Sequence, residues 1–211
     1  NAPTLVDGAM YSVAFDGIDG VGNIAATVTS TSVTYDVTAP VFSSVSPVTE
    51  SSVITANVGY TISEALASGS VTFTRTGGSA DGSSPHVVNL TGAELNVGTF
   101  SGALTNAPTL VDGTIYSVSF DGVDASGNAA VTVTSTSVTY DVTAPVFSSI
   151  SPATSASVNT ANVGYTLSET LASGTVTYTR TGGNVDGSSP HVVTLTGVEL
   201  NAGAFSGALT N

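Results

Sequence analysis

The feature that most constrains this chain is an internal repeat with a period of 105 residues. Residues 1–17, NAPTLVDGAMYSVAFDG, return as NAPTLVDGTIYSVSFDG at 106–122. The stretch TSVTYDVTAPVFSS occurs unchanged at 31–44 and 136–149, and about four positions in five are identical over the whole period. A period of this length exceeds that of a solenoid and equals a small autonomous domain. The 211 residues therefore span two periods.

Each period is predicted to consist of strands. Seven extended segments follow one another at 41–47, 57–63, 70–76, 86–90, 98–104, 115–122 and 129–140. In the sixth, Tyr116, Val118 and Phe120 alternate with serines, which gives the strand one apolar and one polar face. Turns rich in Gly, Asn and Asp separate the segments. This pattern predicts an all-β fold of tandem immunoglobulin-like antiparallel β-sandwiches with a 105-residue repeat.

The strand pattern divides the chain into three parts. Residues 1–35 are expected to be the last two strands of one repeat, 36–140 a complete repeat, and 141–211 the first five strands of the next. The repeated stretch is then the seam between domains, stiffened by Pro40 and Pro145. The apolar alternation changes phase along 129–140, which predicts a bulge where the last strand leaves its sheet.

Neither end part is expected to have a complete core of its own. One interpretation is that the chain is a window on a longer array of repeats. The other is that copies associate head to tail by strand complementation, the start of one chain completing the end of the next, which would build an open filament. The window on a longer array is the preferred interpretation.

Composition narrows the possible partners. The net charge is −13, and Arg75 and Arg180 are the only cationic side chains apart from histidine. Such a surface is unsuited to nucleic acid or anionic lipid and attracts cations, above all calcium. No apolar run approaches the roughly 20 residues of a membrane span. The chain has no Cys, so disulfides, zinc–thiolate sites and thiol catalysis are excluded.

Several motifs carry a family resemblance. YDVTAP following FDGVDASGNAAVTVTSTSVT, together with SGSVTFTRTGG and DGSSPHVV, resembles the bacterial Ig-like extender repeats of large secreted surface adhesins. The resemblance implies a spacer at the bacterial cell surface, outside the cell, with calcium bracing the junctions between domains. It also implies that the partners are neighbouring repeats in the same chain or filament. Cell-surface or glycan ligands would be gripped by other modules.

Acidic turns are expected to meet at the N-terminal end of the complete repeat. Calcium takes about six to eight oxygen ligands in flexible geometry, so carboxylates from several loops suit it. The predicted ligands are Asp36, Glu64, Asp121, Asp124 and Asn128, with Asp141 and Glu169 beginning the equivalent site one repeat later and Asp16 and Asp19 belonging to the preceding copy. The alternative, that these residues simply form ordinary turns, stays open. Glu94 and Asp7 are expected to be solvated.

The remaining motifs do not indicate an enzyme. DGSSPH holds Asp81, two serines and His86, but neighbours in one short loop cannot easily form a hydrolytic relay, so an exposed loop is expected. Arg75 is expected to pair with a nearby carboxylate such as Asp81. A second class of function is a carbohydrate- or protein-binding Ig-like module with its loops as the recognition surface. The repeat favours the spacer, and a glycan array would separate the two.

Overall fold

The computed structural model describes residues 2–210, and it confirms the predicted all-β class. Within these residues the only helical elements are two 3-10 turns, η1 (Gly92–Leu95) and η2 (Gly197–Leu200), and no helix is long and apolar enough to cross a membrane. The chain forms two compact units, of which the first ends at Val142 and the second begins at Thr143.

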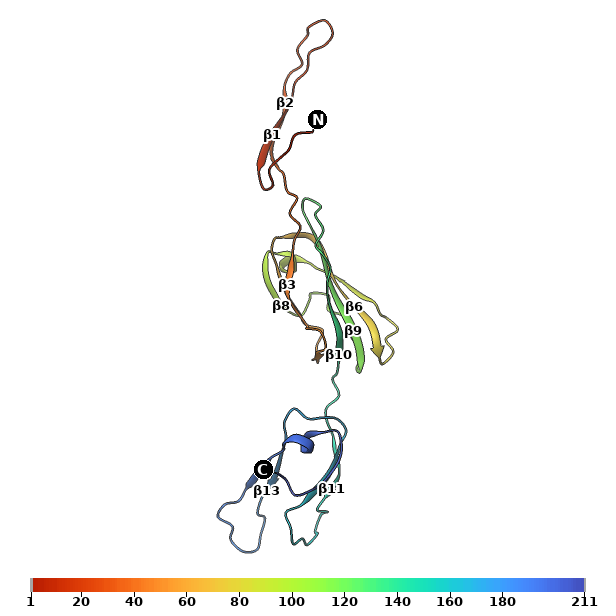
Figure 1. Cartoon of the computed structure of the whole chain (residues 1–211), viewed down its shortest axis with the longest axis vertical. Helices are drawn as coiled ribbons and strands as arrows, with labels where there is room; N and C mark the ends of the chain where they lie inside the picture. The colour runs from red at the N-terminus through yellow and green to blue at the C-terminus, as the bar shows by residue number, and fades with distance from the viewer. Residues whose placement is uncertain (1, 211) are drawn as a thin grey trace. The chain divides into compact units, whose positions relative to one another are not determined.

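The first unit begins with an antiparallel hairpin of β1 (Met10–Phe15) and β2 (Val28–Thr34). A link then leads into two facing sheets. Figure 1 labels β3 and β8 on one of them and β6, β9 and β10 on the other. One sheet has the order β3-β5-β8, formed by β3 (Phe42–Ser46), β5 (Val58–Ile62) and β8 (Gly98–Gly102). The other has the order β4-β10-β9-β6-β7, formed by β4 (Ser52–Val53), β10 (Val133–Tyr140), β9 (Thr114–Asp124), β6 (Leu66–Gly78) and β7 (His86–Asn89).

All seven strands expected in the complete repeat form, and one further strand was not predicted. The short β4 pairs in parallel with β10, with Ser52 opposite Thr139 and Val53 opposite Tyr140. The predicted bulge in β10 is confirmed by a register shift between Ser135 and Val138. Ser137 lies inside that bulge with a φ of 56°. This left-handed conformation is uncommon for a residue other than glycine and is accommodated by the bulge.

The core lies between the two sheets. Along β9 every second residue from Thr114 to Asp124 is buried, so Tyr116, Val118 and Phe120 face inward as the alternation predicts. Phe42 and Tyr60 from the opposite sheet pack edge to face with ring centroids 5.5 Å apart. Burying an aromatic or branched aliphatic side chain contributes about 1.5–3 kcal/mol, so this cluster is the main source of stability.

The second unit is also made of strands. Its three-stranded sheet has the order β11-β12-β15, formed by β11 (Phe147–Ser151), β12 (Val163–Leu167) and β15 (Gly203–Gly207). Its second sheet contains only β13 (Thr175–Tyr178) and β14 (His191–Thr194). The buried core is correspondingly small and consists of Val163, Tyr165, Leu167 and Leu195.

Candidate metal centre

Three carboxylates meet at the end of the complete sandwich where the link enters. Asp36 comes from the link itself, Glu64 from the turn between β5 and β6, and Asp124 from the end of β9. One oxygen of each lies within 4.8 Å of the others, which makes them the group of acidic residues in the described chain that could hold a metal ion. Asp124 is buried, and the other two are half-buried.

The turn after β9 fixes this cluster. Asp124 Oδ1 accepts the backbone N–H groups of Ser126 and Asn128, each at 2.8 Å, and its Oδ2 accepts Asn128 Nδ2 at 2.9 Å. The same amide nitrogen donates to the backbone carbonyl of Asp36 at 3.2 Å, and Ser126 Oγ donates to Asp36 Oδ2 at 2.9 Å. Asn128 therefore orients the two aspartates through its N–H groups and ties the link to the turn.

The pKa of Glu64 is affected by the other charges of the cluster. Burial and the nearby charges of Asp36, Asp124 and Asp7 raise the pKa of Glu64 above its ordinary value. Burial would also raise the pKa of Asp124, but the hydrogen bonds from Asn128 and Ser126 outweigh it and the pKa is lowered. Glu64, with a raised pKa, and Asp124, with a lowered pKa, thus lie close together in the same cluster.

No arginine relieves this repulsion within the unit. Arg75 lies opposite Tyr116, whereas Asp124 lies opposite Leu66 at the other end of the same pair of strands. The Arg75 guanidinium donates instead to the carbonyls of Gly78 and Ser79, at 2.8 and 2.7 Å. The donor set contains only oxygen, which fits calcium and not a soft metal. Asp36, Glu64 and Asp124 would hold such an ion, and its positive charge would offset theirs.

Asp121, Asp16 and Asp19, which were also predicted as ligands, do not join this cluster. Asp121 has the opposite parity to Asp124 along β9, so it points to the outer face of the sheet, where Thr132 Oγ1 donates to its Oδ1. In the preceding copy, Asp16 accepts the hydroxyl of Thr27. Asp19 is bonded within its own turn, and the bonds from Asn23 and Val21 lower its pKa.

Asp141 and Glu169 belong to different units and are described separately. The backbone N–H of Asp141 donates to the carbonyl of Val53 at 3.0 Å, which closes the pairing of β4 with β10. In the second unit, Glu169 Oε1 is buried without a hydrogen-bond partner among the described residues.

Asp7 is exposed, as expected, and it also contacts the link from the side of the preceding copy. Its Oδ1 accepts the backbone N–H of Val37 at 2.8 Å, and its Oδ2 accepts the hydroxyl of Thr38 at 2.5 Å. These bonds lower the pKa of Asp7, the hydroxyl of Thr38 having the largest effect. The link is therefore held by the hairpin from one side and by Asn128 and Ser126 from the other.

The expectation that Glu94 is solvated is wrong. Its side chain is buried, with Oε2 accepting Thr91 N at 2.6 Å and Oε1 accepting Thr105 N at 2.6 Å. Glu199 in the second unit repeats the contacts, with Thr196 N and Thr210 N each at 2.7 Å. The signal that sequence reasoning missed is the spacing T-x-x-E, which is typical of a capping box.

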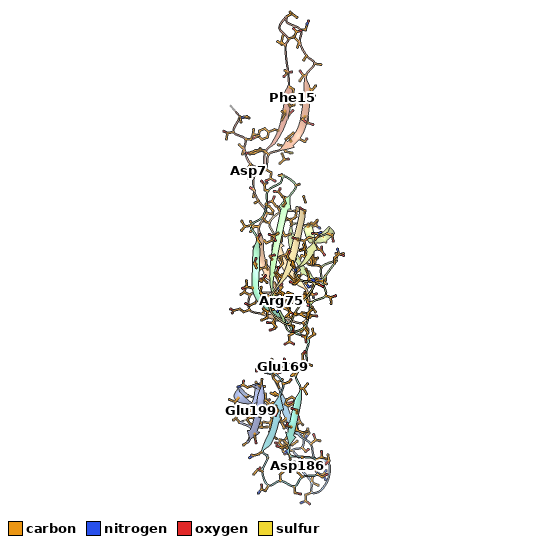
Figure 2. The ribbon with its side chains drawn as sticks, turned by 90° about the vertical axis from the view of Figure 1, so that its right-hand side faces the viewer. Asp7, Phe15, Arg75, Glu169, Asp186 and Glu199 are labelled. Atoms are coloured by element: carbon orange, nitrogen blue, oxygen red, sulfur yellow. The ribbon has the colours of Figure 1, made fainter. Side chains whose placement is uncertain are left out.

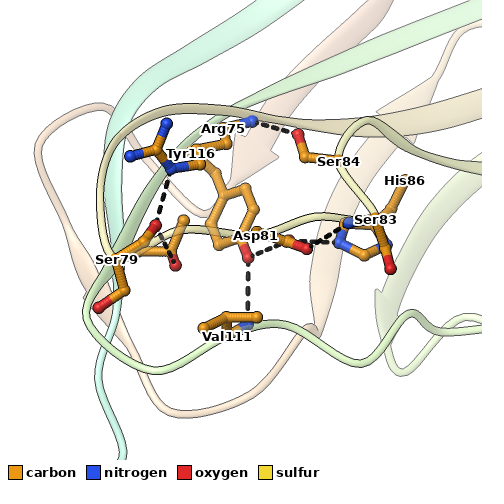
Figure 3. A network of polar contacts seen from close by, with 9 residues as sticks. Arg75, Ser79, Asp81, Ser83, Ser84, His86, Val111 and Tyr116 are labelled. Carbon is orange, nitrogen blue, oxygen red and sulfur yellow. Dashed lines mark hydrogen bonds and ion pairs between the residues drawn. The ribbon is translucent and has the colours of Figure 1, made fainter.

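The DGSSPH loop is partly buried, which corrects the expectation of an exposed loop. Figure 3 shows Asp81 between two partners: His86 Nε2 lies 2.6 Å from its Oδ2, and Tyr116 donates its hydroxyl to the same oxygen at 2.7 Å. These bonds lower the pKa of Asp81 to about 2, with Tyr116 the larger cause. Arg75 does not pair with Asp81. Ser84 Oγ accepts the backbone N–H of Arg75 at 2.7 Å.

A comparison of the sequence with known protein families and with curated proteins found no match.

Proposed function

We propose that this chain is a structural spacer, made of tandem Ig-like repeats of a large extracellular adhesin or filament at a bacterial surface, with calcium rigidifying the junctions. The observation that carries the proposal is the convergence of Asp36, Glu64 and Asp124 beside the link. A cation there joins the link, the β5–β6 turn and the end of β9, which are three separate parts of the unit.

The strand order supports the Ig-like assignment. A three-stranded sheet facing a sheet that contains the last two strands is an arrangement used by immunoglobulin-related sandwiches. The hydroxyl of Tyr116, near the start of β9, accepts the N–H of Val111 at 3.1 Å, which is the contact of a tyrosine corner. Tyr11 accepts the N–H of Val6 at 2.8 Å in the preceding copy.

The location of the aromatic rings favours a spacer over a glycan-binding module. Carbohydrate sites commonly present exposed rings on which a sugar can stack. In residues 36–140 every Phe and Tyr is buried or half-buried. The chain also carries a net charge of −13, which keeps an extended surface protein soluble.

Calcium titration of the 211-residue chain tests the junction. Isothermal calorimetry should detect a site that is lost in Asp124→Asn, whereas the matched control Asp121→Asn, on the outer face of the same strand, should bind as wild type. At a hundredfold excess over Kd, bound calcium adds about 2.7 kcal/mol to the stability of the folded state. That corresponds to a rise in Tm of about 10–20 °C for a domain of this size.

Small-angle scattering with calcium and then with chelator provides the second measurement. A flexible junction samples a wider range of maximum dimensions than a braced one, so chelation should change the scattering profile. If chelation alters neither the profile nor the Tm, the junction is a proline-stiffened link without calcium. If Asp121→Asn loses binding as Asp124→Asn does, the assignment of the ion to Asp36, Glu64 and Asp124 is wrong.

A further inference from the structure

The second unit has an open apolar groove. An opening of about 420 Å³ lies between its two sheets, lined by Phe147, Ile150, Val163, Tyr165, Val176 and Tyr178. On one side of this groove, β13 pairs only with β14 in the described chain. The ring of Phe147 is 46 % exposed, whereas its repeat equivalent Phe42 is 4 % exposed in the complete sandwich.

The complete sandwich shows which segment covers such a groove. There the equivalent strand β6 pairs with β9, with Val71 opposite Phe120 and Phe73 opposite Val118. All four side chains are buried. The covering element is therefore the hairpin of β9 and β10, whose equivalent in the second unit does not lie within residues 143–210.

The chain carries an unpartnered copy of that covering element. The hairpin β1–β2 is the repeat equivalent of β9–β10, and its apolar face lies open. Phe15 is 63 % exposed where Phe120 is fully buried, and Val33 is 42 % exposed where Val138 is 1 % exposed. Figure 2 marks Phe15 on this hairpin.

We propose that copies of this chain join head to tail, the hairpin β1–β2 of one copy adding to β13 of the next and closing its groove. Applying the period of 105 residues to the β6–β9 register places Phe15 opposite Val176 and Val13 opposite Tyr178. Donor and acceptor are different surfaces, so the contact is heterologous and propagates into an open filament. The pairing depends on apolar burial and strand hydrogen bonds, and it is independent of calcium and of the spacer function.

Glycines make the proposed register testable. In the complete sandwich Gly122 lies opposite Gly69, and a Cβ at Gly122 would come within 2.7 Å of Leu66 Cδ1. The equivalent contact joins Gly17 of one copy to Gly174 and Leu171 of the next. Within a single chain, a Cβ at Gly17 would meet only Ala25 Cβ, at 4.0 Å. A side chain at Gly17 is thus harmless in the separate hairpin and obstructive in the assembly.

The strands that would pair carry no charge. MYSVAF, VTSTSVT and TVTY contain no ionisable group except tyrosine, so no like charges face one another in the new sheet. The whole chain nevertheless has a net charge of −13, and two copies repel at long range. Salt screens this repulsion, and assembly should therefore strengthen as ionic strength rises.

Sedimentation velocity over a wide concentration range tests the proposal. The wild-type chain should form dimers and longer species, in calcium and in chelator alike, and Gly17→Val should be monomeric. The matched control is Gly20→Val in the turn of the same hairpin, where a Cβ meets nothing within 4 Å, and it should assemble as wild type. A wild-type chain that stays monomeric at every concentration, or two variants that behave alike, would overturn the proposal.

A cross-link supplies a second, independent readout of the register. Thr72 lies opposite Ser119 in the complete sandwich, so Thr177 of one copy should lie opposite Ala14 of another. The natural chain has no Cys, and a disulfide can form only between introduced residues. Mixing Ala14→Cys chains with Thr177→Cys chains should give a disulfide-linked heterodimer under mild oxidation. The same yield from Ala14→Cys mixed with Ser148→Cys, in the other sheet, would refute the register.

Discussion

Replacing Glu94 by glutamine should destabilise the complete sandwich strongly although it changes a single atom. Each carboxylate oxygen of Glu94 serves one threonine: Oε2 accepts the N–H and hydroxyl of Thr91, and Oε1 accepts those of Thr105. An amide offers one oxygen and one NH2 group. Whichever way it turns, the N–H of one threonine faces another donor.

The magnitude follows from these four bonds. A hydrogen bond to a charged group contributes about 1.5–3 kcal/mol, and a buried donor left without a partner costs about 1–3 kcal/mol. The combined loss for Glu94→Gln is therefore about 3 kcal/mol in the free energy of unfolding. With a urea m-value of about 1–3 kcal/mol per molar, the unfolding midpoint should fall by about 1–3 M.

The effect also has a pH signature. Burial would raise the pKa of Glu94, but the bonds from Thr105 and Thr91 outweigh it and hold the pKa below the ordinary value of 4.5. A lowered folded pKa means that the stabilisation is present above the unfolded pKa and is lost as pH falls through the folded one. Wild type should therefore lose its advantage over Glu94→Gln as pH falls below the ordinary pKa of 4.5 and through the lower folded value.

Hydrogen exchange measured by mass spectrometry in urea is the suitable assay, because peptides from β5 and β9 report on the complete sandwich alone. Glu199→Gln is the matched control, since it removes the same contacts from the second unit and should leave exchange in β9 unchanged. A change below about 0.5 kcal/mol for Glu94→Gln, as for an ordinary surface substitution, would refute the reasoning.

Two further predictions concern the ends of β9. Glu64→Gln should raise the Tm in chelator, because the raised pKa of Glu64 shows that its negative charge is unfavourable there. The same substitution should lower calcium affinity. Thermal melts with and without calcium test both effects, and a variant that lost stability in both conditions would contradict the prediction. Tyr116→Phe removes the hydroxyl shared by Asp81 and Val111 and should cost about 1–3 kcal/mol in urea unfolding. Tyr11→Phe, whose hydroxyl accepts from Val6 in the preceding copy, should leave the sandwich unaffected, and equal effects would argue against the Asp81 contact.

The strands of the complete repeat were predictable because apolar residues alternate along them. The exception was β4, since two residues are too few to show a period and the pairing with β10 is parallel. The convergence of Asp36, Glu64 and Asp124 was also predictable, because each lies where a strand begins or ends. The inclusion of Asp121 ignored the alternation itself: Phe120 faces inward, so its neighbour faces outward.

Burial of polar side chains was the harder part. Glu94 and Asp81 lie in segments rich in turn residues, which sequence reasoning treats as solvated. Their partners are distant in the chain, Thr105 for Glu94 and Tyr116 for Asp81. No local sequence pattern predicts such a contact. Only the T-x-x-E spacing carried information, and it indicates the bond to Thr91 but not the one to Thr105.

The parallel pairing of β4 with β10 has a mechanical consequence. The chain enters the complete sandwich shortly before β4 and leaves it directly after β10, so a pull on the two ends draws these strands in opposite directions along their length. The joining bonds run from Glu50 N to Thr136 O, from Thr139 N to Ser51 O and from Asp141 N to Val53 O. Sliding one strand past the other strains these three bonds together, whereas peeling would open them one by one. Tension along the chain is thus resisted in shear by the pairing of β4 with β10.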